Sequence, residues 1–188
     1  MNELYISVDI ETTGPTPGKY SMFEIGAVCV DSPDYDFHAH VAPLNNAYNP
    51  EALAATGTSI ETLRGRGDKP RVAMGQFARW IERPANFHGW RPVFVANNAP
   101  FDWMFVAWYF EKFGIKNPFG HSALDMKAYF MGMTGSTWEE ATLKRMAEYT
   151  GVQFEKLPHR ALEDAVIQGK IFSKLLHSQR PKRPRRKP

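Results

Sequence analysis

The order of the apolar segments constrains the fold of this chain more than any other feature. Residues 4–9, 23–30 and 36–41 read as strands that follow one another near the start. We expect these three strands to form an antiparallel meander. Residues 93–96 then read as a fourth strand and 123–125 as a fifth, with helical patterns between and after them. Strands followed by strand–helix units predict an α/β layered fold with a mixed sheet.

The helices are predicted from apolar spacing and from the residues that end them. Residues 49–62 are expected to form one or two short helices broken at Gly57. Residues 72–81 show helical spacing, and Pro84 is expected to end that helix. The other expected helices are one that runs to Phe113 before Gly114, one over 142–149 closed by Gly151, and a long one over 160–176.

Length and charge suggest one domain with a short basic tail. With 188 residues and 43% hydrophobic content, the chain can bury one core but is short for two, so we expect one domain over residues 1–179. Residues 180–188 (RPKRPRRKP) hold six of the 23 Lys and Arg, which leaves 17 basic against 20 acidic residues, a net charge of −3, elsewhere. Prolines and like charges predict a disordered arm, whose role is phosphate contact, localisation or solubility.

The cysteine count and the start of the chain bear on the compartment. Cys29 is the one cysteine, so intramolecular disulfides are excluded and a reducing, cytoplasmic compartment is expected. Residues 1–8 lack a basic region followed by a long apolar stretch. The most apolar segment, 101–110, is interrupted by Asp102 and is too short to span a bilayer. We therefore expect neither secretion nor membrane insertion.

The motif DIETTG at the end of the first strand is the first candidate for chemistry. Side chains alternate along a strand, so Asp9 and Glu11 share one face, where two close carboxylates repel unless a cation lies between them. Thr12, Thr13 and Gly14 are expected to form a tight turn whose backbone N–H groups meet a phosphate or a terminal sugar. The alternative is a polar strand end with solvated acids.

Two further motifs carry acids at the starts of helices. NNAPFD ends in Asp102, which lies near a helix N-terminus because Pro100 fits the first turn. Helix capping alone would also explain this acid. HRALED runs from His159 to Asp164, and these two share a site only if His159 precedes the helix on a mobile loop, which Pro158 favours. The alternative is a surface histidine beside a charged helix start.

Taken together, the three motifs resemble the DEDDh group of 3′–5′ exonucleases, which includes ribonuclease T, oligoribonuclease and polymerase proofreading subunits. The resemblance also covers EIGAV (24–28) and Asp125, and it extends to about Leu176. It implies a ribonuclease H-like three-layer fold with a central mixed five-stranded sheet flanked by helices. Asn97, where many members have His, and Pro15, where several have an apolar residue, depart from the pattern. The residues that match the family's five functional positions are Asp9, Glu11, Asp102, His159 and Asp164.

The resemblance implies a mechanism with two Mg²⁺ ions, which Mn²⁺ is able to replace. Such ions lie about 3.5–4 Å apart and stabilise the attacking and leaving oxygens of the scissile phosphate. Asp9 would bridge both ions, and Glu11 and Asp164 would complete the site on the nucleophile side. Asp102 would hold the other ion through water, and His159 would deprotonate the attacking water. The products would be nucleoside 5′-monophosphates.

The expected partner is a nucleic acid with a free 3′ end. RNA is favoured over single-stranded DNA, and a homodimer is allowed. The residues expected to bind substrate are Thr12, Thr13 and Phe101, the last by stacking on a base or, alternatively, as a core aromatic.

Three other interpretations stay open on the sequence alone. One is a binding module that keeps the fold without the chemistry, although none of the matched acids is missing. Another is a DNA-specific proofreading or repair exonuclease. The third is zinc binding through His38 and His40, which share a strand face, although two histidines without further ligands usually mark a solvated face.

Overall fold

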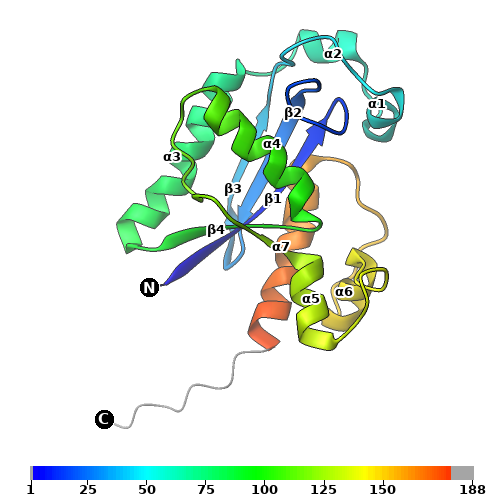
Figure 1. Ribbon diagram of the computed structural model, residues 1–188. Coiled ribbons are helices and arrows are strands. Elements are labelled where there is room, and N and C mark those ends of the chain that lie inside the picture. Colours follow the sequence, from blue (N-terminus) through cyan, green and yellow to red (C-terminus); the bar gives the residue numbers. More distant parts are fainter. Residues whose placement is uncertain (1, 179–188) are drawn as a thin grey trace.

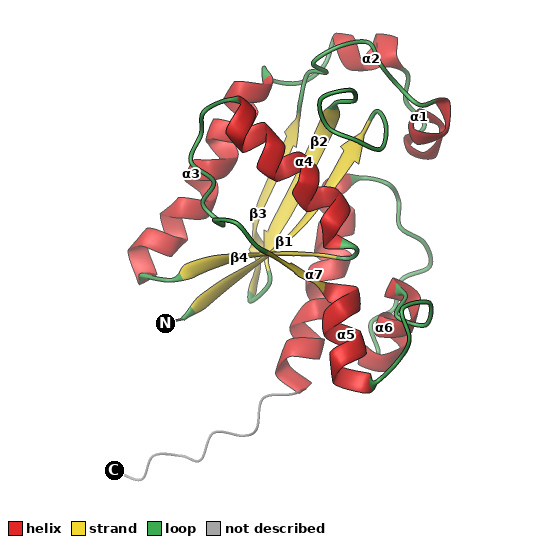
Figure 2. Cartoon of the chain, viewed as in Figure 1, coloured by secondary structure: helices red, strands yellow, loops and turns green. Residues whose placement is uncertain are grey.

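A five-stranded mixed sheet forms the centre of the protein (Figures 1 and 2). The computed structural model describes residues 2–178, and the predicted basic arm, 180–188, lies outside the described residues. Strand order is β3–β2–β1–β4–β5: the first three strands pair antiparallel, as the meander predicted, and β4 and β5 run parallel to β1. The strands are β1 (Glu3–Thr12), β2 (Met22–Cys29), β3 (Ser32–His40), β4 (Arg91–Ala96) and β5 (Ala123–Asp125).

Helices cover both faces of this sheet, which confirms the expected α/β three-layer architecture. α3 and α4 lie on one face, and α7 lies on the other with α5 and α6 beside it (Figure 1). Within residues 2–178, none of the helices combines the length and the hydropathy that a membrane-spanning segment requires. The helices are α1 (Pro50–Thr56), α2 (Ile60–Arg64), α3 (Pro70–His88), α4 (Ala99–Lys112), α5 (Met126–Thr134), α6 (Leu143–Thr150) and α7 (Ala161–Ser178).

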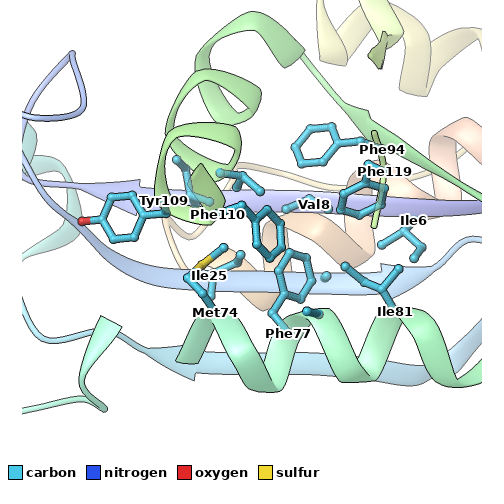
Figure 3. Close-up of a cluster of buried hydrophobic side chains, with 14 of the residues drawn as sticks. Ile6, Val8, Ile25, Met74, Phe77, Ile81, Phe94, Tyr109, Phe110 and Phe119 are labelled. Atoms are coloured by element: carbon cyan, nitrogen blue, oxygen red, sulfur yellow. The ribbon is translucent and has the colours of Figure 1, made fainter. Parts of the chain in front are cut away.

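β1 presents apolar side chains to one layer of helices and most of its polar side chains to the other. Ile6 and Val8 point toward α3 and α4, where they join a buried cluster with Phe77 and Phe110 (Figure 3). The intervening residues face α7, and Ser7 Oγ donates a hydrogen bond of 2.8 Å to the backbone carbonyl of Ala165 in that helix. Alternation along one strand therefore anchors the core and presents the odd-numbered side chains to α7.

The start of α7 packs directly against β2 because Gly26 has no side chain. A Cβ atom at this position would lie 2.2 Å from the backbone of Ala161. Close approach of helix and strand brings the first turn of α7, which includes Asp164, over the odd-numbered side chains of β1.

Two helix predictions were wrong or incomplete. Pro84 does not end its helix, and α3 continues to His88. A proline at this position leaves the carbonyl of Trp80 without its helical donor, and the Tyr35 hydroxyl donates to that carbonyl at 2.9 Å instead. Helix α5 was not predicted, and it is started by Asp125, whose side chain accepts from the backbone N–H of Ala128.

Candidate active site

Asp9 and Glu11 lie on the α7 face of β1, beyond the point where β4 stops pairing with this strand. Asp9 Oδ1 accepts a hydrogen bond of 2.6 Å from the side-chain amide of Gln168 in α7. The amide oxygen of Gln168 in turn accepts from the backbone N–H of Asn97 at 2.7 Å, just after β4 ends. One glutamine therefore fixes the position of Asp9 relative to both α7 and the end of β4.

Asp102 reaches the same end of β1 from the first turn of α4. Its Oδ1 accepts a hydrogen bond of 3.2 Å from the backbone N–H of Ile10, and the side chain is buried. The start of α4 is held in turn by Asp125, whose Oδ2 accepts from the N–H of Ala99 at 2.7 Å. Asp102 thus bonds to β1 from the start of α4, so helix capping does not describe this acid.

Asp164 and His159 reach the site from the start of α7. His159 precedes α7, as the spacing required, and its backbone adopts a positive φ of 55° that is uncommon outside glycine. Ligand atoms of Glu11, His159 and Asp164 all lie within 4.8 Å of one another. Among the described residues, Asp164 Oδ1 is buried without a hydrogen-bond partner. The structure therefore brings all five matched residues to one end of the sheet.

Burial disfavours the charged form of all four acids, and neighbouring carboxylates add to this at Asp9 and Glu11. Burial, followed by the charges of Asp102 and Glu11, raises the pKa of Asp9 well above its usual range. Burial and the charge of Asp164 raise the pKa of Glu11 to about 8. Burial also raises the pKa of Asp102 to about 8 and that of Asp164 to about 6, although nearby His159 acts to lower the latter. Such a cluster needs either protons or cations to be stable at neutral pH.

The donor set fits hard divalent cations. Carboxylate oxygens are the ligands that Mg²⁺ and Mn²⁺ prefer. Among the described residues, the buried Asp164 Oδ1 accepts no hydrogen bond, so its lone pairs are available to a positive ion. A bound cation would also offset the repulsion that raises the pKa values of these acids.

The expected substrate residues occupy different environments. They are Thr12, Thr13 and Phe101. Both Thr13 donors are engaged within the described part of the chain: its N–H donates to the Ser21 carbonyl at 2.7 Å and its hydroxyl to that of Ala47 at 2.8 Å. The Thr13 N–H is therefore engaged within the protein, and substrate binding by Thr13 stays a prediction.

Thr12 is buried, and its hydroxyl donates to the Gly14 carbonyl at 2.9 Å. Phe101 is partly buried, with its ring 5.5 Å from that of Phe105 and some surface left exposed beside Asp102. Phe101 thus packs against the core and keeps part of its surface exposed, and stacking of a base on its ring stays a prediction.

Sequence reasoning missed Gln168 within the site and Glu24 beside it. Gln168 follows Asp164 by four residues, so helical spacing places both on the same face of α7, and that spacing was the available signal. Glu24 pairs directly with Glu11 across β1 and β2, and its charge contributes to the raised pKa of Glu11. Its position follows from the strand register, which the sequence did not reveal.

Comparisons with known proteins bear on the family of this chain. A family model described as exonuclease matches residues 6–172. The 3′–5′ DNA exonuclease Cap18 of Escherichia coli is 39% identical over 172 residues, which is 90% of this chain and 90% of that protein. Ribonuclease T of Haemophilus influenzae (strain PittGG) is 28% identical over 178 residues, which is 89% of this chain and 76% of that protein.

A solved structure shares the fold. The nuclease domain of 3′hExo, described as a DEDDh family member bound to rAMP, superposes with a TM-score of 0.78. The match covers 95% of this chain and 94% of that chain at 15% sequence identity. This likeness confirms the expected ribonuclease H-like arrangement of sheet and helices.

Proposed function

The chain belongs to the DEDDh family of 3′–5′ exonucleases, and on this premise we propose that it releases nucleoside 5′-monophosphates one at a time from the 3′ end of a single strand. The observation that carries the proposal is the convergence of four acids and one histidine from three separate elements at the end of β1. The five residues proposed as catalytic are Asp9, Glu11, Asp102, His159 and Asp164.

We propose that the four acids hold two Mg²⁺ ions, for which Mn²⁺ can substitute. When bound, these ions supply positive charge that stabilises the attacking and leaving oxygens of the phosphodiester. The hydrogen bond from Gln168 keeps Asp9 oriented, and that from the Ile10 backbone does the same for Asp102. The acids are thus held in position before substrate arrives, which favours catalysis.

His159 is proposed as the general base. It lies beside Glu11 and Asp164 on the segment that enters α7, so its imidazole can accept the proton of a water molecule that attacks the scissile phosphate. The carboxylate of Asp164 close by would stabilise the imidazolium that forms.

Single-stranded DNA is the first substrate that we propose, with RNA as the second. The sequence alone favoured RNA, and the relative of 28% identity is a ribonuclease. The relative of 39% identity is described as a DNA exonuclease, and this difference in identity supports DNA. Ribose and deoxyribose differ at the 2′-OH, so sugar recognition at the terminal nucleotide will decide between them.

A time course on matched oligonucleotides tests the proposal. Single- and double-stranded DNA and RNA of one sequence, labelled at the 5′ end, are incubated with Mg²⁺ or with EDTA, and the products are separated by length. We expect 5′-labelled single strands to shorten one nucleotide at a time in Mg²⁺ and to persist in EDTA. Release of long internal fragments would contradict exonuclease action, and binding without cleavage would instead support the silent binding module.

Two further expectations remain proposals. A cytoplasmic location would be checked by fractionation of cells that express the full chain. A homodimer would be checked by sedimentation of the purified protein.

A further inference from the structure

A second group of metal-ligating side chains lies next to the catalytic acids. Glu24 of β2 pairs directly with His40 of β3, and His38 lies two residues before His40 on the same strand face. Ligand atoms of Glu24, His38 and His40 all lie within 4.8 Å of one another. The two histidines that the sequence placed on one strand face therefore have a third potential ligand, which comes from the neighbouring strand.

These three residues differ from the catalytic acids in chemistry. Two imidazole nitrogens and one carboxylate form a ligand set that suits Zn²⁺ and related transition metals, whereas a set of carboxylates suits Mg²⁺. We propose that Glu24, His38 and His40 form a separate binding site for a Zn²⁺-class ion. The proposal does not depend on the proposed function, because it rests on these three side chains.

The His38–Glu24 pair requires little rearrangement to bind such an ion. His38 Nε2 lies 2.7 Å from Glu24 Oε1, joined by a hydrogen bond. Tetrahedral ligands at about 2.0–2.2 Å from zinc are about 3.3–3.6 Å apart. Replacing the shared proton with the ion therefore needs these two atoms to separate by about 0.6–0.9 Å. The side chain of His38 is 36% exposed, so its ring has room to turn, and that of Glu24 is 11% exposed.

The surroundings leave space for a fourth ligand. Glu24, His38 and His40 line a pocket of about 440 Å³ that His159 also lines. Arg66 and Arg160 also line this pocket, and their positive charges oppose a cation. Arg160 is paired with Glu163 at 3.0 Å, which offsets its charge. The charge of Arg66 favours an anion rather than neutral water as the fourth ligand.

Cobalt serves as a spectroscopic probe for the site. Co²⁺ held by nitrogen and oxygen ligands in a tetrahedral site absorbs visible light far more strongly than Co²⁺ in an octahedral oxygen site. Full-length protein in saturating Mg²⁺ is titrated with Co²⁺, and Zn²⁺ is then added to displace it. We expect one equivalent of Co²⁺ to give a strong visible band that Zn²⁺ removes.

Matched variants locate the ion. His38→Gln and His40→Gln should each weaken binding by more than about 100-fold, because each removes a ligand and even outer partners cost 10–100-fold. His121→Gln, at an exposed histidine of a different pocket, should bind as the wild type does. Circular dichroism checks that all variants fold, which the exposure of His38 and His40 favours.

The outcomes separate this site from the catalytic one. A strong band that survives in Asp9→Asn and disappears in both the His38 and His40 variants supports the proposal. A band that is absent, that persists in both histidine variants, or that is lost in Asp9→Asn overturns it. None of these measurements requires hydrolysis, so failure of the proposed function would leave the result interpretable.

Discussion

Removing the charge of Glu11 while keeping its shape should stabilise the metal-free protein. In the folded state burial and the charge of Asp164 raise the pKa of Glu11 to about 8, against an ordinary value of 4.5. A carboxyl with a raised pKa contributes its full stability below pH 4.5 and loses it as the pH rises through about 8. Glu11→Gln does not titrate, so the variant escapes this loss.

The expected gain follows from the size of the shift. Each pKa unit is worth about 1.36 kcal/mol, so holding a proton at pH 7 that the unfolded chain releases near 4.5 costs the fold up to about 3 kcal/mol. Partial solvent access and relaxation of the neighbouring acids reduce this, and we expect the variant to be about 1–2 kcal/mol more stable. For a chain of this size, that gain raises the melting temperature by about 2–8 °C.

Thermal unfolding in EDTA across pH 4 to 8 measures this gain. Wild type and Glu11→Gln should melt together near pH 4 and diverge as the pH rises, with the variant the more stable. Glu139→Gln, at an exposed glutamate, is the matched control and should follow wild type. Excess Mg²⁺ should narrow or reverse the difference, since only wild type keeps the full ligand set. A pH-independent difference in EDTA, or a less stable variant at pH 8, would refute the reasoning.

Three further predictions concern activity and binding. Asp9→Ala should abolish hydrolysis and leave the circular dichroism spectrum unchanged; cleavage at the wild-type rate, or full wild-type activity in EDTA, would exclude the proposed metal chemistry. His159→Ala should lower the rate by about 10²–10⁴-fold, retain metal binding and lose the acid limb of the pH–rate profile, whereas an unchanged profile would remove His159 from the mechanism. Deleting residues 180–188, which carry six basic side chains, should reduce the slope of log affinity against log salt by up to about 4 for a short oligonucleotide bound in Ca²⁺. Superimposable salt plots would leave localisation or solubility as the role of this segment.

Local patterns in the sequence predicted most of the elements and the grouping of the acids and His159. Alternation along a strand placed Asp9 and Glu11 on one face, and this is how β1 presents them to α7. The spacing of His159 and Asp164 required a break before the helix, and α7 begins at Ala161. Both inferences depend only on the periodicity of side chains along a strand or a helix, which can be read from a short segment of sequence.

The remaining features depend on contacts between distant segments. Helix α3 accommodates Pro84 because the Tyr35 hydroxyl donates to the Trp80 carbonyl, which the proline leaves without a helical donor. Tyr35 and Pro84 are far apart in sequence. The hydrogen bonds of Thr13 to Ser21 and Ala47 likewise join segments that no local pattern relates. Glu24 was not recognised as a third potential ligand beside His38, because only the register of β2 and β3 brings them together.

The division of β1 into an apolar and an acidic face links folding to the chemistry of the site. Slipping this strand by one residue would turn Asp9 and Glu11 into the apolar layer beneath α3 and α4, and would turn Val8 toward α7. Burying two carboxyl groups there without hydrogen-bond partners would remove a large part of the stability of a domain of this size. Any chain that reaches the folded state has therefore already aligned these acids with Asp102 and Asp164.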